Sequence, residues 1–236
     1  DVMCNKEVKC GAFYRFAKNA GADAIATGHY RSGEKDQSYF LWAVPKEVLD
    51  VALFPVGYME KEKVRLLAKK FNLPVAEKKD SQGVCFLGSI SVEEFLRSEF
   101  GVMPGRALDE QGNVVGEHDG VLLHTLGERI ALRNALESGP WFVLAKNIET
   151  NEFVVGKTRI SKSQTHQKVF FVDVNWLGNS SSVTEAQCRY RGQRIQGSVT
   201  DLCFVSTSTL LEIPTPGQSI VFYKGDELVG GGIIAS

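Results

Sequence analysis

Two cysteines of the sequence lie where a thiolate would be stabilised. Cys85 lies in the small-residue loop 80–88, directly after the basic segment Glu77-Lys78-Lys79. Neighbouring cations lower the pKa of an exposed thiol from about 8.5, and glycines in the loop allow its backbone to move. Cys4 precedes an expected helix, whose N-terminus also favours a thiolate. Two such cysteines suggest a reactive pair, whereas the alternative for Cys85 is a half-buried side chain in an ordinary loop.

The other three cysteines, Cys10, Cys188 and Cys203, lie among apolar or strand residues and are expected to be structural. The chain has no Cys-x-x-Cys pair and no histidine cluster with zinc-ligand spacing. Five scattered cysteines also do not fit the disulfide framework of a small secreted protein. We therefore expect no structural metal.

The elements that would position these cysteines begin with two amphipathic helices. Apolar residues recur at helical spacing and form one stripe on each helix: Phe13, Phe16, Ala17 and Ala20 in the first, and Val64, Leu67, Ala68 and Phe71 in the second. Each stripe needs a sheet or another helix to cover it. A further short helix is expected to start at Ser91, because Ser91 and Glu94 form a capping box, and to end near Phe100-Gly101.

Between the two amphipathic helices, residues 22–27 form a short, mostly apolar run that is typical of a parallel strand buried on both faces. The run stops at Gly28-His29, at the strand end where α/β sheets bind ligands. A chain that opens on a helix and one parallel strand leaves that strand without the neighbours it needs. The sequence therefore predicts that the first domain is incomplete.

From Pro104 onward the pattern changes to short strands and turns. Residues 106–108 and 114–115 are expected to form a hairpin, and residues 219–223 and 228–234 a second one at the end of the chain. Further strands are expected at residues 141–144, 153–155, 168–174, 187–191 and 198–203. This spacing is typical of a barrel or sandwich rather than of βαβ units.

Composition narrows the class of protein. The 236 residues (26.0 kDa) are 43% hydrophobic and 23% charged, which indicates a folded chain of two or three domains and excludes disorder. With 27 Lys and Arg against 28 Asp and Glu, the net charge of -1 excludes a histone-like binder of nucleic acid but leaves room for a local basic face. No apolar stretch approaches the roughly 20 residues of a membrane span, and residues 1–5 do not resemble a signal peptide, so we expect a cytoplasmic protein.

Four blocks of the sequence, in this order, resemble the tRNA-specific 2-thiouridylases, the MnmA or TrmU family: Asp1–Lys6, Gly21–Tyr30, Lys35–Leu41 and Asp80–Phe86. Weaker similarity lies at residues 118–120, 125–129, 189–191, 216–218 and 222–225. The resemblance covers almost the whole chain. It implies an α/β fold for residues 1–90, the C-terminal part of a PP-loop ATP pyrophosphatase domain of the adenine nucleotide alpha hydrolase type. A small central β-containing domain (91–163) and a C-terminal β-barrel (164–236) would follow.

The resemblance also implies a reaction, that of a tRNA-uridine 2-sulfurtransferase. ATP, with Mg²⁺, would adenylate the C2 oxygen of the wobble uridine (position 34) of tRNA, and sulfur would replace that oxygen to give 2-thiouridine. Cys85 would carry the sulfur as a persulfide received from a sulfur-relay protein or a cysteine desulfurase. Cys4 would release it, by forming a disulfide with Cys85 or by activating the sulfur as hydrosulfide.

Further site residues follow from the resemblance position by position. Asp1 would lie beside the target base, as a catalytic or RNA-binding acid, and Gly28 would allow close approach of the nucleotide. Contacts with tRNA are implied for His29, Lys35, Asp36, Gln37, Arg189, Tyr190 and Gln218. Taken without the resemblance, His29 is a strand-end histidine, residues 35–37 are a solvated helix start, and Arg189-Tyr190 is the exposed face of a strand. The basic residues Lys157, Arg159, Lys162 and Lys168 could follow a phosphate backbone, and Trp42, Trp141 and Trp176 are expected in cores.

The sequence departs from the family pattern in several places. It contains no Ser-Gly-Gly-x-Asp-Ser phosphate loop, and the glycine run 230–232 lies inside a strand pattern and does not substitute for it. The connection 31–34 is short, Glu128 stands where Gln is common, and Cys10 where Phe is common. We expect the chain to be most of a 2-thiouridylase without its first part. The alternatives are a non-catalytic tRNA-binding fragment and, last, a thiol-redox or sulfur-relay protein that does not bind RNA.

Overall fold

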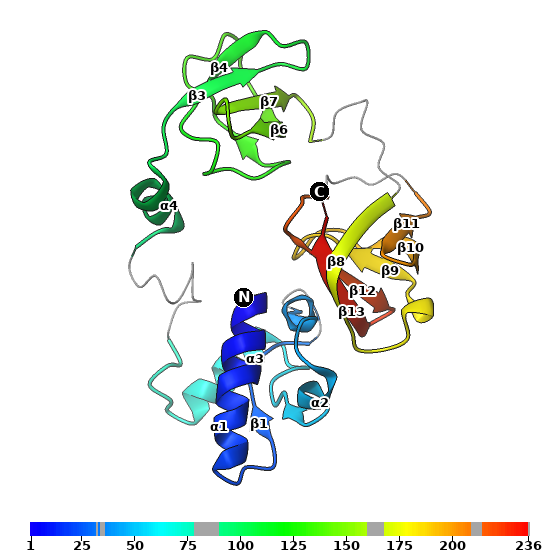
Figure 1. Ribbon diagram of the computed structural model, residues 1–236. Coiled ribbons are helices and arrows are strands. Elements are labelled where there is room, and N and C mark those ends of the chain that lie inside the picture. Colours follow the sequence, from blue (N-terminus) through cyan, green and yellow to red (C-terminus); the bar gives the residue numbers. More distant parts are fainter. Residues whose placement is uncertain (32, 34–35, 78–89, 160–167, 209–213, 236) are drawn as a thin grey trace. The chain divides into compact units, whose positions relative to one another are not determined.

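The computed structural model describes residues 1–31, 33, 36–77, 90–159, 168–208 and 214–235 (Figure 1). The chain forms two compact units. The first contains Asp1–Lys78, Gln167–Ser208 and Pro216–Ser236, and the second contains Lys79–His166 and Thr209–Thr215. No helix in the described ranges is both long enough and apolar enough to cross a membrane.

The first unit opens on a long helical segment, made of the π-helical η1 (Cys4–Phe13) and of α1 (Tyr14–Asn19). Its packed face carries Cys10, Tyr14 and Ala17, which join a core with later parts of the unit. The expected stripe is therefore only partly right, because Phe13 and Phe16 are 51% and 70% exposed. The pattern missed Cys10 and Tyr14, which are less apolar than the two phenylalanines but face the core.

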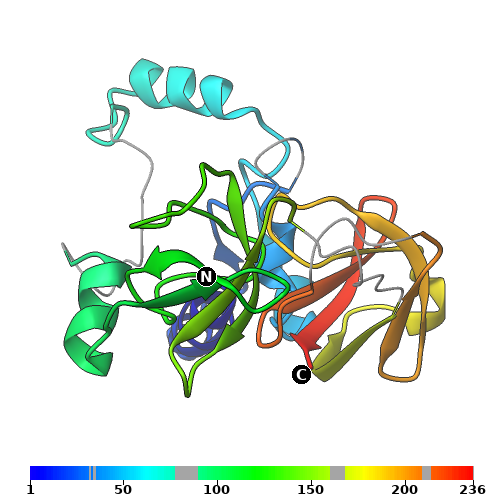
Figure 2. The ribbon, with the colours of Figure 1, turned by 90° about the horizontal axis from the view of Figure 1, so that it is seen from above.

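The second expected helix is α3 (Lys61–Lys70), drawn in cyan in Figure 2. Val64, Leu67 and Ala68 are half-buried on one face, as predicted, but Phe71 lies beyond the last turn and is exposed. Two shorter helices precede it, the 3-10 helix η3 (Ser38–Leu41) and α2 (Lys46–Leu49). The structure thus confirms the helix but not full burial of its stripe.

The expected parallel strand is β1, which is limited to Ile25–Ala26. It pairs in parallel with β2 (Ala52–Leu53), and the ladder continues as Thr27 N donates to Leu53 O at 2.9 Å. Two predictions are therefore wrong: the strand has a partner, and only Ile25 is buried while Ala26 is exposed. No sequence pattern indicated β2, because a two-residue strand shows no periodicity.

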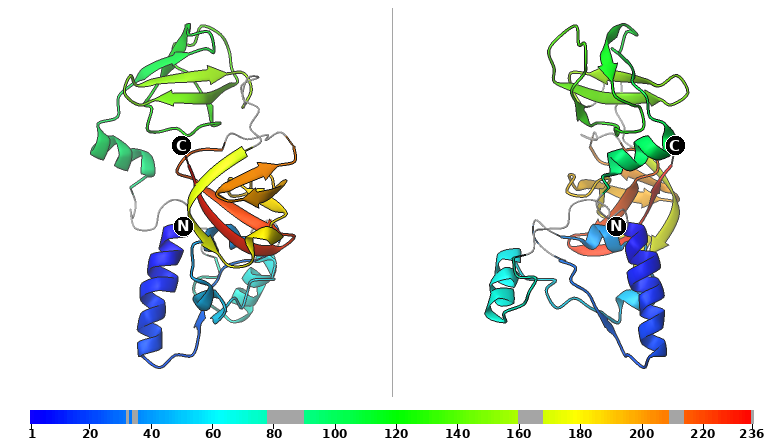
Figure 3. Two further views of the ribbon diagram at one scale, coloured as in Figure 1. Left: turned by 45° about the vertical axis from the view of Figure 1, so that its right-hand side comes forward. Right: turned by 90° about the vertical axis from the view of Figure 1, so that its left-hand side faces the viewer.

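The C-terminal part of the first unit is a closed barrel in the order β10-β11-β8-β13-β12-β9 (Figure 3). Its strands are β8 (Lys168–Trp176), β9 (Glu185–Gln187), β10 (Ile195–Thr200), β11 (Cys203–Ser206), β12 (Ser219–Lys224) and β13 (Glu227–Ile234). A 3-10 turn, η5 (Ser180–Ser182), precedes β9. The barrel and the terminal hairpin β12–β13 were both predicted.

Two of the strands expected in this region are wrong in extent. The strand predicted at 187–191 is β9, which ends at Gln187, and the residues after it form a turn with Arg191 at φ 59°. The strand predicted at 198–203 is divided into β10 and β11, because Asp201 adopts φ 54° and reverses the chain. Left-handed backbone at Arg and Asp is uncommon, and neither turn contains the Asn-Gly or Gly-Gly signal of a hairpin.

Glycine in β13 lets the helical part of the unit pack directly on the barrel. A Cβ at Gly231 would lie 2.6 Å from the indole of Trp42, so only glycine allows this contact. Trp42 Nε1 donates to Ser219 Oγ at 3.0 Å, and Asn175 Nδ2 donates to the carbonyl oxygen of Trp42 at 2.7 Å. The glycine run 230–232 is therefore part of a strand, as predicted, and it also packs in the core of the unit. Trp42 is a core residue.

The second unit contains α4 (Val92–Phe100) and a five-stranded sheet in the order β4-β3-β7-β6-β5. Its strands are β3 (Gly105–Leu108), β4 (Val114–His118), β5 (Arg129–Ile130), β6 (Trp141–Asn147) and β7 (Glu152–Gly156). The predicted capping box is present: Glu94 N donates to Ser91 Oγ at 3.1 Å, and Ser91 N donates to Glu94 Oε2 at 2.8 Å. Gly101 ends α4 in the left-handed conformation.

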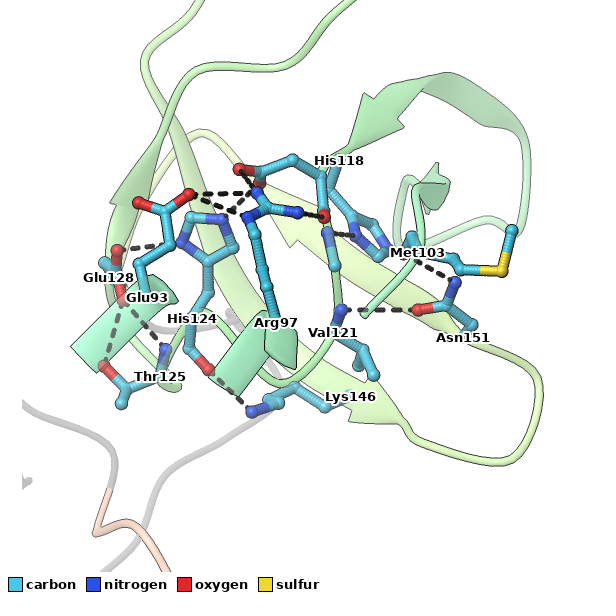
Figure 4. Close-up of polar contacts among 12 residues, drawn as sticks. Glu93, Arg97, Met103, His118, Val121, His124, Thr125, Glu128, Lys146 and Asn151 are labelled. Atoms are coloured by element: carbon cyan, nitrogen blue, oxygen red, sulfur yellow. Dashed lines mark hydrogen bonds and ion pairs between the residues drawn. The ribbon is translucent and has the colours of Figure 1, made fainter. Parts of the chain in front are cut away.

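Alternating charges tie α4 to the loop between β4 and β5 (Figure 4). Arg97 Nη2 donates to Asp119 Oδ2 at 3.0 Å and pairs with Glu93 of its own helix at 3.0 Å. The imidazole of His124 bonds Asp119 Oδ1 through Nε2 at 2.8 Å and Glu128 Oε1 through Nδ1 at 2.9 Å. We call this series, Arg97, Asp119, His124 and Glu128, the charge ladder.

Candidate functional site

The carboxyl end of β1 is joined to the first helix by a small buried polar cluster. His29 Nε2 lies 3.1 Å from Asn5 Oδ1, and His29 Nδ1 lies 2.8 Å from Thr27 Oγ1. Asn5 Nδ2 donates to the carbonyl oxygen of Phe40 at 3.0 Å, and Lys9 Nζ donates to Asn5 Oδ1 at 3.0 Å. Because Asn5 Oδ1 can only accept, His29 Nε2 carries the proton and Nδ1 accepts from the Thr27 hydroxyl.

This geometry fixes a neutral imidazole. Asn5 and His29 are 1% and 7% exposed. Burial, with a smaller contribution from the charge of Lys9, lowers the pKa of His29 to about 4. His29 is therefore uncharged at neutral pH and acts as a hydrogen-bonding spacer between helix and strand.

The reactive residues expected at the N-terminus lie beside this cluster. Cys4 is half-buried and immediately precedes Asn5, whose backbone N–H donates to the carbonyl oxygen of Asp1 at 2.9 Å. Gly28, the residue before His29, is exposed, and no atom lies within 4 Å of the position of a Cβ there. An open strand end can take a ligand, as the sequence predicts for α/β sheets. Cys85 lies outside the described residues.

A cavity of about 460 Å³ opens on the same unit and is lined by Arg31, Gly33, Asp36 and Ser38 and by the turn after β9. Guanidinium, phenol and carboxylate groups predominate among its lining side chains: Arg31, Arg191, Arg194, Tyr58, Tyr190, Tyr223, Asp36 and Asp226. Cys4, Asn5 and His29 do not line it. The mixture of cations and aromatic rings suits a ligand with phosphate and a planar ring.

Three comparisons with family models match successive parts of the chain. The tRNA methyl transferase HUP domain matches residues 1–89, the tRNA methyl transferase PRC-barrel domain residues 93–157, and the Aminomethyltransferase beta-barrel domain residues 166–234. A tRNA-specific 2-thiouridylase MnmA of Halalkalibacterium halodurans is 37% identical over 257 residues, which cover 99% of this chain and 69% of the relative. The enzymes of Geobacillus thermodenitrificans (38%, 99% and 69%) and Pseudomonas fluorescens (37%, 99% and 70%) are similarly close.

The chain belongs to the tRNA-specific 2-thiouridylase family. The predicted family is thus confirmed, and so is the predicted order of a HUP-type α/β domain, a central domain and a C-terminal β-barrel.

Of the RNA contacts expected for a 2-thiouridylase, the structure brings Asp36 and Tyr190 together in the cavity. Tyr190 lies in a turn rather than on a strand face, so the alternative of an exposed strand is wrong. Gln37 closes a loop, because its Oε1 accepts from Tyr30 N at 3.1 Å. Lys35 lies outside the described residues.

The other expected contacts of a 2-thiouridylase lie elsewhere. Arg189 is half-buried beside the cavity but does not line it, and neither does Gln218, at the start of β12. His29 has partners on both ring nitrogens. Of the basic run, Lys157 lies 3.5 Å above the ring of the buried Trp141 and donates to Ser138 O, which explains its presence without RNA.

Of the charged and aromatic cavity residues, sequence reasoning did not single out six: Arg31, Tyr58, Arg191, Arg194, Tyr223 and Asp226. Arg191 could have been predicted, because it is the last residue of the block 189–191 that resembles the family. Arg31 and Tyr58 come from separate loops that a backbone hydrogen bond joins, as Arg31 N donates to Gly57 O at 2.7 Å. That pairing depends on the β1–β2 ladder, which the sequence did not reveal. Among the described residues there is no group of three or more metal-ligating side chains.

Proposed function

We propose that this protein converts the wobble uridine of tRNA to 2-thiouridine. The name tRNA-specific 2-thiouridylase, which its relatives carry, supports this reaction at the level of the family. The observation that supports the proposal is the buried Asn5–His29 bond, which joins the residue after Cys4 to the residue after the open Gly28. The Cys4 thiol would then lie near the ligand edge of the strand.

The strand end fits a nucleotide at the edge where α/β sheets bind them. Gly28 offers room for close approach, since a Cβ position there is free of neighbours. Bound ATP, with Mg²⁺, would make the C2 oxygen of the uridine a better leaving group. Asp1 is exposed at the same helix start and is our candidate for the acid beside the target base.

The two cysteines would divide the sulfur chemistry. Cys85 would carry a persulfide supplied by a sulfur-relay protein or a cysteine desulfurase. The Cys4 thiolate would attack the inner sulfur, forming a Cys4–Cys85 disulfide and expelling hydrosulfide. The hydrosulfide would add to C2 of the adenylated uridine, and the C2 oxygen would leave as part of AMP. The disulfide is the two-electron oxidised product, so an external thiol must reduce it before the next turnover.

Binding of tRNA would use the cavity side of the unit. Asp36 and Tyr190 line the cavity and remain proposed contacts, together with Arg189 and Gln218 near it. Lys35 and Gln37 belong to the same segment as Asp36. His29 would act mainly through its hold on Asn5, because both its nitrogens are occupied.

The test is sulfur incorporation into tRNA by the full-length protein with ATP and a persulfide donor. We expect Cys85→Ser to abolish 2-thiouridine formation while the Kd for tRNA changes less than about twofold, and Cys10→Ser to retain activity. Thiolation that survives in Cys85→Ser would overturn the persulfide role. Binding of tRNA without any thiolation by the wild-type protein would favour a non-catalytic binder. A disulfide without salt-sensitive tRNA binding would favour a redox relay.

A further inference from the structure

The geometry points to the 460 Å³ cavity as a pocket for one unstacked nucleotide of the RNA substrate, distinct from the uridine that is thiolated. This inference rests on the proposed function. Its base would stack on Tyr190, and its phosphate would lie between Arg31 and Arg191. Cys4 does not line the cavity, so the inference assigns the cavity to a nucleotide other than the reacting one.

The cavity has the size of a site for a single small ligand. Pockets of roughly 300–1,000 Å³ hold small molecules and cofactors, so this one admits a mononucleotide but not a helical stretch of RNA. Single-stranded loops are recognised through bases that leave the stack and lie on aromatic side chains. Such a loop is also where a base open to chemistry at C2 must lie.

Tyr190 provides a rigid platform for such a base. Its ring centroid lies 4.4 Å from that of Phe40 and 6.0 Å from that of Tyr39, so the phenol is supported from behind by the core of the unit. Phe40 also joins the pocket to the reactive site, because its carbonyl oxygen accepts from Asn5. An occupied pocket would thus bear on the residues that hold the helix start of Cys4.

The three arginines of the cavity divide into two kinds. Arg194 is committed to the protein: it lies 3.6–3.8 Å from the carboxylates of Asp36, Glu185 and Asp226, and 4.0 Å above the ring of Tyr223. Within the described part of the chain, ion pairs are found for neither Arg31 nor Arg191, which lie over the rings of Phe54 and Tyr190. Among the described residues neither of these two cations has a carboxylate partner, so both are available to bind phosphate.

The carboxylates of the cavity restrict where the phosphate of a bound nucleotide can lie. Asp36 and Asp226 lie on the Arg194 side of the lining, where they would repel a phosphate but could accept from the N–H groups of a base edge. A phosphate is favoured on the side of Arg31 and Arg191. This division predicts that the phosphate binds near Arg31 and Arg191 and that the base edge binds near Asp36 and Asp226.

A coupling experiment tests the stacking. The full-length protein is titrated with anticodon stem-loop RNAs that each carry one abasic position, for wild type and for Tyr190→Leu. We expect one abasic position, other than that of the thiolated uridine, to weaken wild-type binding about fivefold or more and Tyr190→Leu binding less than twofold. Phe170→Leu, at a 60% exposed aromatic of β8, is the matched control and should behave as wild type. Equal losses at every position in wild type and Tyr190→Leu would overturn the inference.

Salt dependence tests the phosphate contact. Arg31→Gln and Arg191→Gln should each flatten the slope of log Kd against log salt by about 0.7, the value for one single-strand phosphate contact. Lys18→Gln, at an exposed position of α1, is the control and should leave the slope unchanged. Unchanged slopes in both arginine variants would contradict the assignment.

Two further outcomes separate this inference from others. Micromolar binding of 2-aminopurine ribonucleoside monophosphate that Tyr190→Leu abolishes would assign the cavity to a free nucleotide and overturn the RNA pocket. Thiolation of an unmodified stem-loop by the wild-type protein reports on the proposed function alone. Coupling at one abasic position without thiolation would therefore support the pocket while the proposed reaction fails, and thiolation without coupling would do the reverse.

Discussion

His29 in the first unit and His124 in the second are each held by two hydrogen bonds, but their partners impose opposite charges. The nitrogens of His29 face an amide oxygen and a hydroxyl, and burial lowers its pKa to about 4. Burial also acts to lower the pKa of His124, but the hydrogen bonds of Glu128 and Asp119 outweigh it and raise the pKa. Partners, and not burial alone, therefore decide the charge of a histidine.

The different partners of His29 and His124 reflect two ways in which a helix is attached to a strand end or to a loop. The first unit joins its helix start to a strand end with neutral bonds, which leave the charge of the reactive site to Cys4 and its ligands. The second unit ties α4 to a loop with the charge ladder, whose residues are all partly exposed. A neutral buried link is costly to break, whereas an exposed ionic link is weak and responds to pH and salt.

The largest expected effect comes from removing the neutral link. Asn5→Ala leaves His29 Nε2 and the carbonyl oxygen of Phe40 buried without their partner, so we expect the first unit to lose about 3 kcal/mol of unfolding free energy. Denaturant unfolding, followed by tryptophan fluorescence in a Trp141→Phe background, measures it. Asn19→Ala, at an exposed position of α1, should cost less than about 0.5 kcal/mol. Equal costs for the two variants would break the comparison.

Acid should weaken the first unit through His29. Its pKa is lower in the folded state than the ordinary 6.5, so the unfolded chain binds the proton first and stability falls as pH falls from 6.5 to about 4. The shift corresponds to a loss on the order of 3 kcal/mol, levelling below pH 4. Unfolding at a series of pH values measures the slope, and His29→Asn should reduce it. A slope that His29→Asn leaves intact would assign it to other groups.

A smaller effect is expected from the charge ladder. Asp119→Asn removes a carboxylate from both Arg97 and His124, and because these groups are partly exposed we expect a loss of about 1 kcal/mol in the second unit. Amide exchange in α4 should accelerate, since Arg97 fastens that helix to the loop. Glu99→Gln, at an exposed position of the same helix, should leave exchange unchanged. If α4 exchanges as slowly in Asp119→Asn as in wild type, the ladder does not hold the helix.

The smallest effect is expected for Glu128→Gln, which tests the contrast between the pH dependence of His124 and that of His29. Because the folded-state pKa of His124 is raised, its contribution to stability is present below pH 6.5 and is lost as pH rises through the raised pKa, opposite to His29. Glu128→Gln installs the residue common in the family and should move the His124 titration downward at a cost of a few tenths of a kcal/mol. The C2-proton NMR titration of His124 measures the shift. An unchanged titration would exclude Glu128 as a partner.

Some features of the two units could be predicted from the sequence and others could not. The capping box at Ser91, the terminal hairpin and the glycine run 230–232 were predictable, because each depends on residues close together in the chain. The ladder was not, since Arg97 and Asp119 are 22 residues apart and no local pattern pairs them. The sequence showed that Glu128 stands where the family commonly has Gln. The hydrogen bond between Glu128 and His124, which explains this difference, could be seen only in the structure.

At the candidate site the sequence supplied residue types and the structure supplied their neighbours. Cys4, Gly28 and His29 were predicted from a helix start and a strand end. Asn5, which joins them, carried no signal because a buried asparagine is defined by its partners. Tyr190 was predicted as an RNA contact, but it was expected on a strand. The turn was missed because Arg191, which adopts a left-handed backbone there, is not a residue type typical of turns.

The most direct test of the proposed sulfur transfer is single-turnover thiolation by the full-length protein without reductant, followed by peptide mapping of its cysteines. The account predicts one Cys4–Cys85 disulfide for each 2-thiouridine formed, with Cys10, Cys188 and Cys203 remaining free thiols. Stoichiometric 2-thiouridine with Cys4 still a free thiol, or a disulfide between Cys85 and a different cysteine, would contradict it.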